Sequence, residues 1–103
     1  MSTGGNLRRR NCRTKSYRDR LNQLPEAIVK LAERAFEVFL RDPLAPALHN
    51  HELEDSGKGQ HRSGSRSVYV NLRYRAIYVV DDNVNVWYWI GSHEDYNNFT
   101  GAK

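Results

Sequence analysis

The spacing of hydrophobic residues changes along this chain, from a helical period in the first half to alternation in the second. In the first half, apolar side chains recur every three or four residues on both sides of Pro25, which is the spacing of one helix face. They are Tyr17, Leu21 and Leu24 before the proline, and Ile28, Val29, Ala32, Ala35, Phe36, Phe39 and Leu40 after it. Pro25 ends the first helix and suits the first turn of a second, which Asp42-Pro43 ends near Arg41. The pattern predicts a helical hairpin over residues 15–41.

The second half of the chain has the composition and alternation of β-strands. Residues 67–72 and 84–90 alternate between two sets of side chains, and residues 74–80 are β-branched and aromatic. In the last strand, one set is Val84, Val86, Tyr88 and Ile90, and the other is Asn85, Trp87 and Trp89. The Asp81-Asp82-Asn83 turn and the short spacing between the strands predict a three-stranded antiparallel meander.

Two polar segments interrupt the regular pattern. Residues 50–65 contain three glycines and few apolar groups, which predicts a long loop around a short strand at residues 51–53. Residues 1–14 are rich in Gly, Asn and Arg, with Leu7 as nearly the only large apolar residue. Since they have little to contribute to a core, we expect a loose basic arm or a weak first strand there.

The end of the chain has the signals of a short helix. Gly91 stops the last strand, and Ser92 with Asp95 three residues later has the form of a capping box, so a helix is predicted over residues 93–99. With 103 residues and 39% hydrophobic content, the chain has material for one core, and we expect a single domain over residues 15–103. Its class is α+β, with a helical hairpin packed on a small antiparallel β-sheet and a short C-terminal helix.

The chain is moderately basic, and its cations gather in two groups. Sixteen Lys and Arg against twelve Asp and Glu give a net charge of +4, which favours partners that carry phosphates or carboxylates. One group is Arg8, Arg9, Arg10, Arg13, Lys15, Arg18 and Arg20, and the other, around the predicted strands, is Arg62, Arg66, Arg73 and Arg75. A solvated arm explains the first group as well as a binding surface does. The second group favours a role in binding nucleic acid.

Several classes of site are absent from the sequence. There is no Walker loop, dinucleotide fingerprint or Gly-x-Ser-x-Gly elbow, which argues against nucleotide-dependent and acyl-transfer chemistry. His49, His51 and His61 lack a cysteine pair, so we interpret them as surface histidines and expect no metal and no cofactor. Cys12 is the only cysteine, and the longest apolar run, residues 76–80, is too short to span a bilayer. We therefore expect a cytoplasmic protein without membrane contact.

Arginine, histidine and tyrosine side chains near the last two strands form the candidate catalytic group. Arg73 and Arg75 lie two apart on a predicted strand, which puts them on one face, and Arg66 can approach them across the hairpin. His93 and Tyr96, three apart, share one side of the terminal helix. Guanidinium groups that hold a phosphate, an imidazole that moves a proton and a phenol that stacks on a base are what metal-free RNA cleavage through the 2′-hydroxyl needs. Structural roles fit equally well: an ion-paired Arg75, an exposed His93 and a core Tyr96.

Residues 17–99 resemble the RelE/ParE superfamily of toxins from bacterial toxin–antitoxin pairs. The segments that carry the resemblance are Leu24-Pro25, Asp42-Pro43, Leu48-His49-Asn50-His51-Glu52-Leu53, Ser67-Val68-Tyr69-Val70, Arg73-Tyr74-Arg75-Ala76-Ile77-Tyr78 and Trp89-Ile90-Gly91-Ser92-His93-Glu94-Asp95-Tyr96. The last two are the most specific, and they are similar to the RelE-like members. The start of the chain departs from the family, whose first strand should be apolar, because residues 7–13 here read Leu-Arg-Arg-Arg-Asn-Cys-Arg.

The resemblance implies a ribosome-dependent endoribonuclease that cleaves messenger RNA without a metal and is held in check by a cognate antitoxin. By position, Arg75 would stabilise the cleaved phosphate, and His93 and Tyr96 would match the C-terminal catalytic residues. Arg66 and Arg73 would be supporting RNA-binding contacts. Two alternatives stay open, because a shared fold does not establish activity. One is a non-enzymatic DNA gyrase inhibitor of the ParE branch, and the other is an inactive module that binds nucleic acid or antitoxin.

Overall fold

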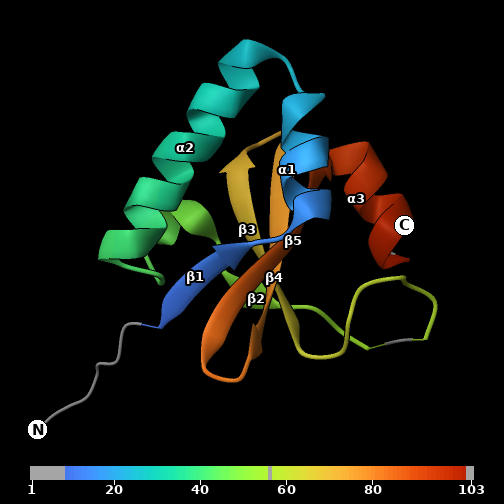
Figure 1. Cartoon of the computed structure of the whole chain (residues 1–103). Coiled ribbons are helices and arrows are strands. Elements are labelled where there is room, and N and C mark those ends of the chain that lie inside the picture. Colours follow the sequence, from blue (N-terminus) through green and yellow to red (C-terminus); the bar gives the residue numbers. More distant parts are fainter. Residues whose placement is uncertain (1–8, 56, 102–103) are drawn as a thin grey trace, which may run out of the picture.

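Five strands, three helices and one short 3-10 helix make up the described part of the chain. The computed structural model describes residues 9–55 and 57–101, so residues 1–8 of the expected basic arm lie outside it (Figure 1). The elements are β1 (Arg10–Arg13), α1 (Lys15–Asn22), α2 (Glu26–Arg41), η1 (Pro46–Leu48), β2 (His51–Glu52), β3 (Ser65–Asn71), β4 (Tyr74–Asp81), β5 (Val84–Ser92) and α3 (His93–Thr100). The predicted helical hairpin, strands and terminal helix are confirmed, within two residues of their expected ends. Within the described ranges, no helix has both the length and the apolar content to span a membrane.

The strands form one mixed sheet in the order β1-β5-β4-β3-β2. β3, β4 and β5 are the predicted antiparallel meander, and β2 adds a short antiparallel edge beside β3. β1 pairs in parallel with the start of β5, from Arg10 opposite Val84 to Arg13 opposite Trp87. The Arg-rich segment therefore contains an edge strand, and this strand makes the sheet mixed where an antiparallel one was expected. The α+β class and the arrangement of the hairpin and terminal helix are confirmed.

Hydroxyl side chains and a proline set the helix ends. The Thr14 hydroxyl accepts a hydrogen bond from the Tyr17 amide (3.1 Å) at the start of α1, and the Ser92 hydroxyl accepts one from the Asp95 amide (3.1 Å) at the start of α3. These bonds satisfy amides that have no partner inside their own helix. Pro25 occupies the N-cap position of α2, one residue before the first turn in which it was expected.

The sheet separates two clusters of buried side chains, and Figure 1 shows α2 to its left and α3 to its right. The larger cluster, beneath α1 and α2, consists of Tyr17, Leu21, Ala32, Phe39, Leu48, Val68, Ala76, Tyr78, Trp87 and Ile90. The smaller cluster, beneath α3, consists of Leu53, Ile77, Trp89 and Tyr96. We call the two sides the α1/α2 face and the α3 face. Phe39 anchors the first, because its ring meets those of Tyr78 and Trp87 edge-on at 5.2 and 4.9 Å.

A bulge in β5 changes the alternation that its sequence predicts. The ladder with β4 skips Tyr88, since Trp87 and Trp89 lie opposite adjacent residues of β4. As a result, Trp87 and Ile90 pack on the α1/α2 face, whereas Tyr88 and Trp89 pack on the α3 face. The prediction that Tyr88 and Ile90 share a face is therefore wrong, because strict alternation requires an unbroken ladder.

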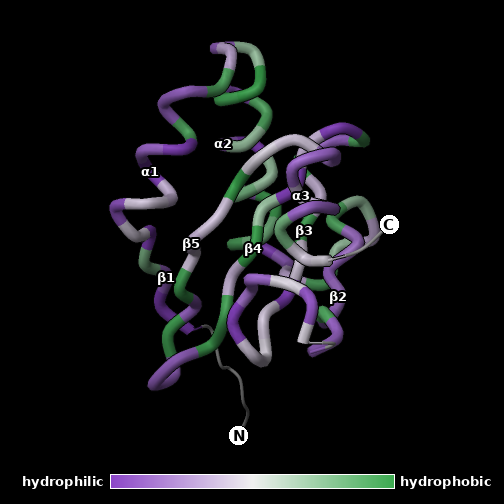
Figure 2. Tube along the Cα trace, turned by 90° about the vertical axis from the view of Figure 1, so that its right-hand side faces the viewer, coloured by the Kyte–Doolittle hydropathy of each residue, from purple (hydrophilic) through white to green (hydrophobic). Residues whose placement is uncertain are grey.

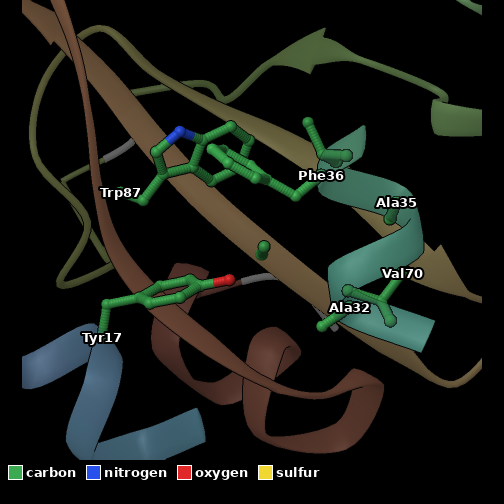
Figure 3. A pocket seen from close by; sticks show the side chains of 8 residues that line it. Tyr17, Ala32, Ala35, Phe36, Val70 and Trp87 are labelled. Atoms are coloured by element: carbon green, nitrogen blue, oxygen red, sulfur yellow. The ribbon is translucent and has the colours of Figure 1, made fainter. Parts of the chain in front are cut away.

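A small apolar cavity lies inside the α1/α2 face (Figure 3). Its walls are the side chains of Tyr17, Ala32, Ala35, Phe36, Val68, Val70, Ala76 and Trp87. Its volume of about 10 Å³ is at the lower limit for one water molecule. Figure 3 shows the Tyr17 hydroxyl directed into this space, and burial raises the pKa of Tyr17 to about 12. The phenol of Tyr17 is therefore neutral at physiological pH.

Candidate active site

Arg75 is the buried centre of the polar groups on the α3 face. It lies in β4 opposite Tyr69 of β3, and only 5% of it is exposed. Its Nη1 donates to three main-chain oxygens at the β3–β4 turn, those of Asn71 (2.8 Å), Leu72 (3.1 Å) and Tyr74 (3.1 Å). These hydrogen bonds offset part of the cost of burying the cation and fix the guanidinium beside the turn.

Two aromatic rings pack against the Arg75 guanidinium. Its central carbon lies 3.6 Å from the centroid of the Tyr69 ring and 6.0 Å from that of the Tyr96 ring, both within the range of cation–π attraction. Within residues 9–55 and 57–101, no carboxylate pairs with Arg75. The ion-pair role considered for Arg75 is therefore wrong for the described chain. Its charge is solvated by carbonyls and rings, which leaves it able to attract an anion.

His93 and Tyr96 are brought together at the start of α3, as their spacing predicts. Tyr96 is buried against Ile77 and Trp89, whereas His93 is exposed. The two rings are close to parallel, with centroids 6.3 Å apart and planes at 22°. The His93 amide donates to the Arg73 carbonyl (2.7 Å), which ties the start of α3 to the β3–β4 turn beside Arg75.

Five side chains form a continuous row on the α3 face, in the order His49, Tyr69, Arg75, Tyr96 and His93. We call them the arginine row. The contact that completes it is the stacking of His49 on Tyr69, with ring centroids 4.3 Å apart and planes at 28°. The row therefore has an imidazole at each end, a phenol ring beside each imidazole and a guanidinium in the middle.

Sequence reasoning missed the parts played by Tyr69 and His49. Tyr69 had a signal, because the β3–β4 hairpin register places it opposite Arg75. No signal in the sequence indicated the part of His49. Its position depends on η1 and on a left-handed backbone (φ +47°) that only a minority of residues other than glycine adopt.

The structure does not bring Arg66 and Arg73 into the row. Arg66 lies opposite Tyr78 on the α1/α2 face, and its Nε donates to the Asn50 side-chain oxygen (2.8 Å). The expectation that Arg66 approaches Arg75 across the hairpin is wrong, because positions three apart along β4 face opposite sides. Arg73 lies in the exposed β3–β4 turn and not on a strand, so it does not share a strand face with Arg75.

A groove of about 500 Å³ adjoins the row at Tyr96. It is lined by His51, Glu52, Leu53, Glu54, Lys58, His61, Tyr96, Thr100 and Gly101. His51 is exposed, and its Nδ1 donates to the His49 carbonyl (2.8 Å). His61 is not the surface histidine expected, because its side chain is only 3% exposed and its Nε2 donates to the Glu54 carbonyl (2.8 Å). In the part of the chain that the structure describes, no group of His, Cys, Asp or Glu could hold a metal ion.

Several solved structures with this arrangement of helices and strands are toxins. YafQ from E. coli strain BL21(DE3) superposes with a TM-score of 0.67 at 14% identity, over 85% of this chain and 97% of that one. The YoeB/ParE toxin from Agrobacterium tumefaciens superposes with a TM-score of 0.62 at 18% identity, and the match covers 82% of this chain and 98% of that one. A chain of the RelBE2 toxin–antitoxin complex from Mycobacterium tuberculosis superposes with a TM-score of 0.61 at 23% identity. The match covers 84% of this chain and 100% of that one. This chain has the RelE/ParE toxin fold.

Sequence comparison adds nothing to that assignment. No sequence-family model matches the chain. No curated protein matches it by sequence. The RelE/ParE likeness therefore concerns the fold, and the activity has to be argued from the side chains that this chain carries.

In the RelE/ParE fold of this chain, the arginine row has the parts needed to hold and break a phosphodiester. Guanidinium groups bind phosphate oxygens through charge-assisted hydrogen bonds. Imidazoles exchange protons near neutral pH, and tyrosine rings provide stacking surfaces for bases. The row combines all three on one face, beside an open groove.

Proposed function

We propose that this chain is the toxin of a toxin–antitoxin pair and that it cleaves messenger RNA on the ribosome as a metal-free endoribonuclease of the cytoplasm. The arginine row carries the proposal, because it places a cation that has no carboxylate partner among the described residues between two aromatic rings, with an imidazole beyond each ring. The fold supports the toxin role, since the three structures compared above are toxins and one of these three is a toxin–antitoxin complex. A cognate antitoxin is accordingly the protein partner that we propose.

The proposed reaction is attack of a ribose 2′-hydroxyl on the adjacent phosphorus, with departure of the 5′-oxygen. A 2′,3′-cyclic phosphate and a 5′-hydroxyl are formed, so one proton leaves the nucleophile and one reaches the leaving group. His93, at the α3 end of the row, serves one of these transfers, and solvent water serves the other. Arg75 binds the non-bridging phosphate oxygens and stabilises the charge that builds on them. Tyr96 packs between Arg75 and His93 and holds both side chains beside the cleaved bond.

Arg73 and Arg66 have weaker parts in this proposal. Arg73 is exposed in the turn that the His93 amide contacts, so it can bind a phosphate next to the cleaved one. Arg66 lies on the opposite face of the sheet and can reach only a more distant part of the RNA. We therefore expect the loss of Arg66 to affect cleavage least.

The test is messenger RNA cleavage in a purified translating-ribosome system. We expect site-specific cuts by the wild type and a loss of rate of about 100-fold or more in His93→Gln and in Arg75→Lys, because each removes one catalytic group. Glu94→Gln is the matched control, since Glu94 is exposed in the first turn of α3 next to His93. It should cleave like the wild type.

Two other outcomes would redirect the assignment. Cleavage that persists in both variants would remove the arginine row from the mechanism. No cleavage by folded wild type would lead to a DNA gyrase supercoiling assay, because gyrase inhibition is the alternative activity. Inactivity in both assays would leave a module that binds nucleic acid or antitoxin.

A further inference from the structure

A second basic surface lies at the edge of the sheet, away from the arginine row. It consists of Arg9, Arg10, Arg13, Lys15 and Arg18, in and around β1 and the first turns of α1. We call it the β1 basic face. Among the described residues, β1 is an outer strand of the sheet that pairs with β5 alone, and much of α1 beside it is hydrophilic (Figure 2).

The carboxylates near this face pair with only part of its charge. Lys15 is bound by Asp19 (2.8 Å), and Arg13 lies 3.7 Å from Glu33 and over the Phe36 ring. Three exposed arginines remain, Arg9, Arg10 and Arg18, and none of them has a carboxylate within 4.0 Å among residues 9–55 and 57–101.

One of these arginines is held in place by the backbone of the edge strand. The Arg18 Nη1 donates to the Arg13 carbonyl (2.6 Å), which directs the Arg18 side chain across the junction of β1 and α1. Arg10 projects from β1 opposite Val84 of β5, on the other side of the strand from Arg13, so the cations flank both sides of this sheet edge. The face is therefore built partly on regular structure, although the chain before Arg9 is outside the described residues.

The chemistry of the face favours a phosphate chain over an acidic protein. Four of its five cations are arginines, whose planar groups bind phosphate oxygens in pairs. A protein interface would need a buried apolar or aromatic anchor at its centre. The exposed large hydrophobic residues of the described chain are Leu40, Leu44, Leu72 and Val80, and none of them belongs to β1 or α1.

Arg10 of the β1 basic face is too far from Arg75 for both to contact the same phosphate. Arg75 lies opposite Gly91, and Arg10 lies opposite Val84, seven residues earlier on β5. At about 3.3 Å per residue, this separation along the strand is roughly 23 Å. We propose that the β1 basic face binds the phosphate backbone of an RNA strand, as a docking surface separate from the arginine row. The inference goes beyond the proposed function, because docking at this face does not require cleavage.

The test is the salt dependence of binding to a short single-stranded RNA with 2′-O-methyl groups, which cannot be cleaved. The double variant Arg10→Gln, Arg18→Gln is compared with Arg34→Gln, Arg41→Gln, which removes the same charge from exposed positions on α2. Binding is measured by fluorescence anisotropy over a series of KCl concentrations. Thermal unfolding of each variant checks that it is folded.

We expect the Arg10→Gln, Arg18→Gln variant to reduce the magnitude of the slope of log K against log salt concentration by about 1.4. Each phosphate contact to a single strand contributes about 0.7 to this slope. At about 150 mM KCl this corresponds to roughly tenfold weaker binding. The α2 variant should change the slope by less than half as much.

Three results would overturn the proposal. Equal effects of the two double variants would mean that net charge alone governs binding. An unchanged slope in the Arg10→Gln, Arg18→Gln variant would mean that RNA does not bind there. Equally tight binding of a poly-glutamate peptide, lost in the same variant, would assign the face to an acidic protein. A wild type that fails to cleave but shows the expected slopes would contradict the proposed function and leave the docking surface standing.

Discussion

The two faces of the sheet use aromatic side chains in different ways. On the α1/α2 face, the rings of Phe39, Tyr78 and Trp87 pack against one another at 4.6 to 5.2 Å. On the α3 face, Tyr69 and Tyr96 pack against a guanidinium and against imidazoles. The same residue type therefore builds a core on one side and surrounds a cation on the other.

The group against which an aromatic ring packs therefore indicates the role of that ring better than its exposed fraction does. Tyr78 and Tyr96 are 4% and 8% exposed, yet Tyr78 packs against two other rings, whereas Tyr96 packs against the Arg75 guanidinium, which has no carboxylate partner among the described residues. Burying such a charge costs free energy, and this arrangement is common where a ligand supplies the opposite charge. The α1/α2 face should therefore dominate stability and the α3 face function.

The largest expected effect on the free energy of unfolding comes from a substitution in the core of the α1/α2 face. Phe39 is 2% exposed and contacts two further rings, so Phe39→Ala should lower the free energy of unfolding by about 3–5 kcal/mol. Urea denaturation measures the loss. Leu44→Ala is the control, because Leu44 is 72% exposed and its removal should cost no more than about 0.5 kcal/mol. A similar loss for both would show that the α1/α2 face is not the main source of stability.

The second largest effect is a loss of up to about 2–3 kcal/mol of unfolding free energy at alkaline pH, and it also concerns the α1/α2 face. The pKa of Tyr17 is about 12 in the folded chain because the ring is buried, against its usual 10 when unfolded. The folded state therefore holds the proton more tightly, and stability present below pH 10 is lost as the pH rises towards 12. Tyr17→Phe removes the titrating group and should make unfolding less dependent on pH in this window. Parallel curves of unfolding free energy for the two proteins would contradict the effect of burial.

The smallest expected effect on stability comes from a substitution on the α3 face, at the ring beside Arg75. Tyr69→Ala removes the ring 3.6 Å from the Arg75 guanidinium and should cost about 0.5–2 kcal/mol. Messenger RNA cleavage should fall as well, because Arg75 and His49 lose the surface on which they pack. Tyr69→Phe keeps the ring and should retain both stability and cleavage. If Tyr69→Phe were as impaired as Tyr69→Ala, the hydroxyl and not the ring would be the important group.

Much of the fold could be predicted because its signals are local. The apolar stripe around Pro25, the turn at residues 81–83 and the Ser92 cap each depend on neighbours in the chain. The bulge at Tyr88 escaped prediction, since a bulge depends on how β5 pairs with β4. The parallel pairing of β1 escaped for the same reason, because Arg10 meets Val84 from the far end of the chain.

The candidate site was predictable only where its residues are close in sequence or in hairpin register. His93 and Tyr96 are three residues apart on one helix, and the structure brings their rings together. Arg66 was misplaced because the hairpin register was guessed, and a shift of one residue moves a side chain to the other face.

The order of the elements, the basic character of the chain and the pairing of His93 with Tyr96 can all be derived from the amino-acid sequence. These properties follow from composition and from spacing within single elements. Only the tertiary structure decided that His49 stacks on Tyr69 and that Arg75 is buried without a carboxylate partner among the described residues. The physical reason is that these contacts join η1, β3, β4 and α3, whose relative positions are fixed by packing across the sheet.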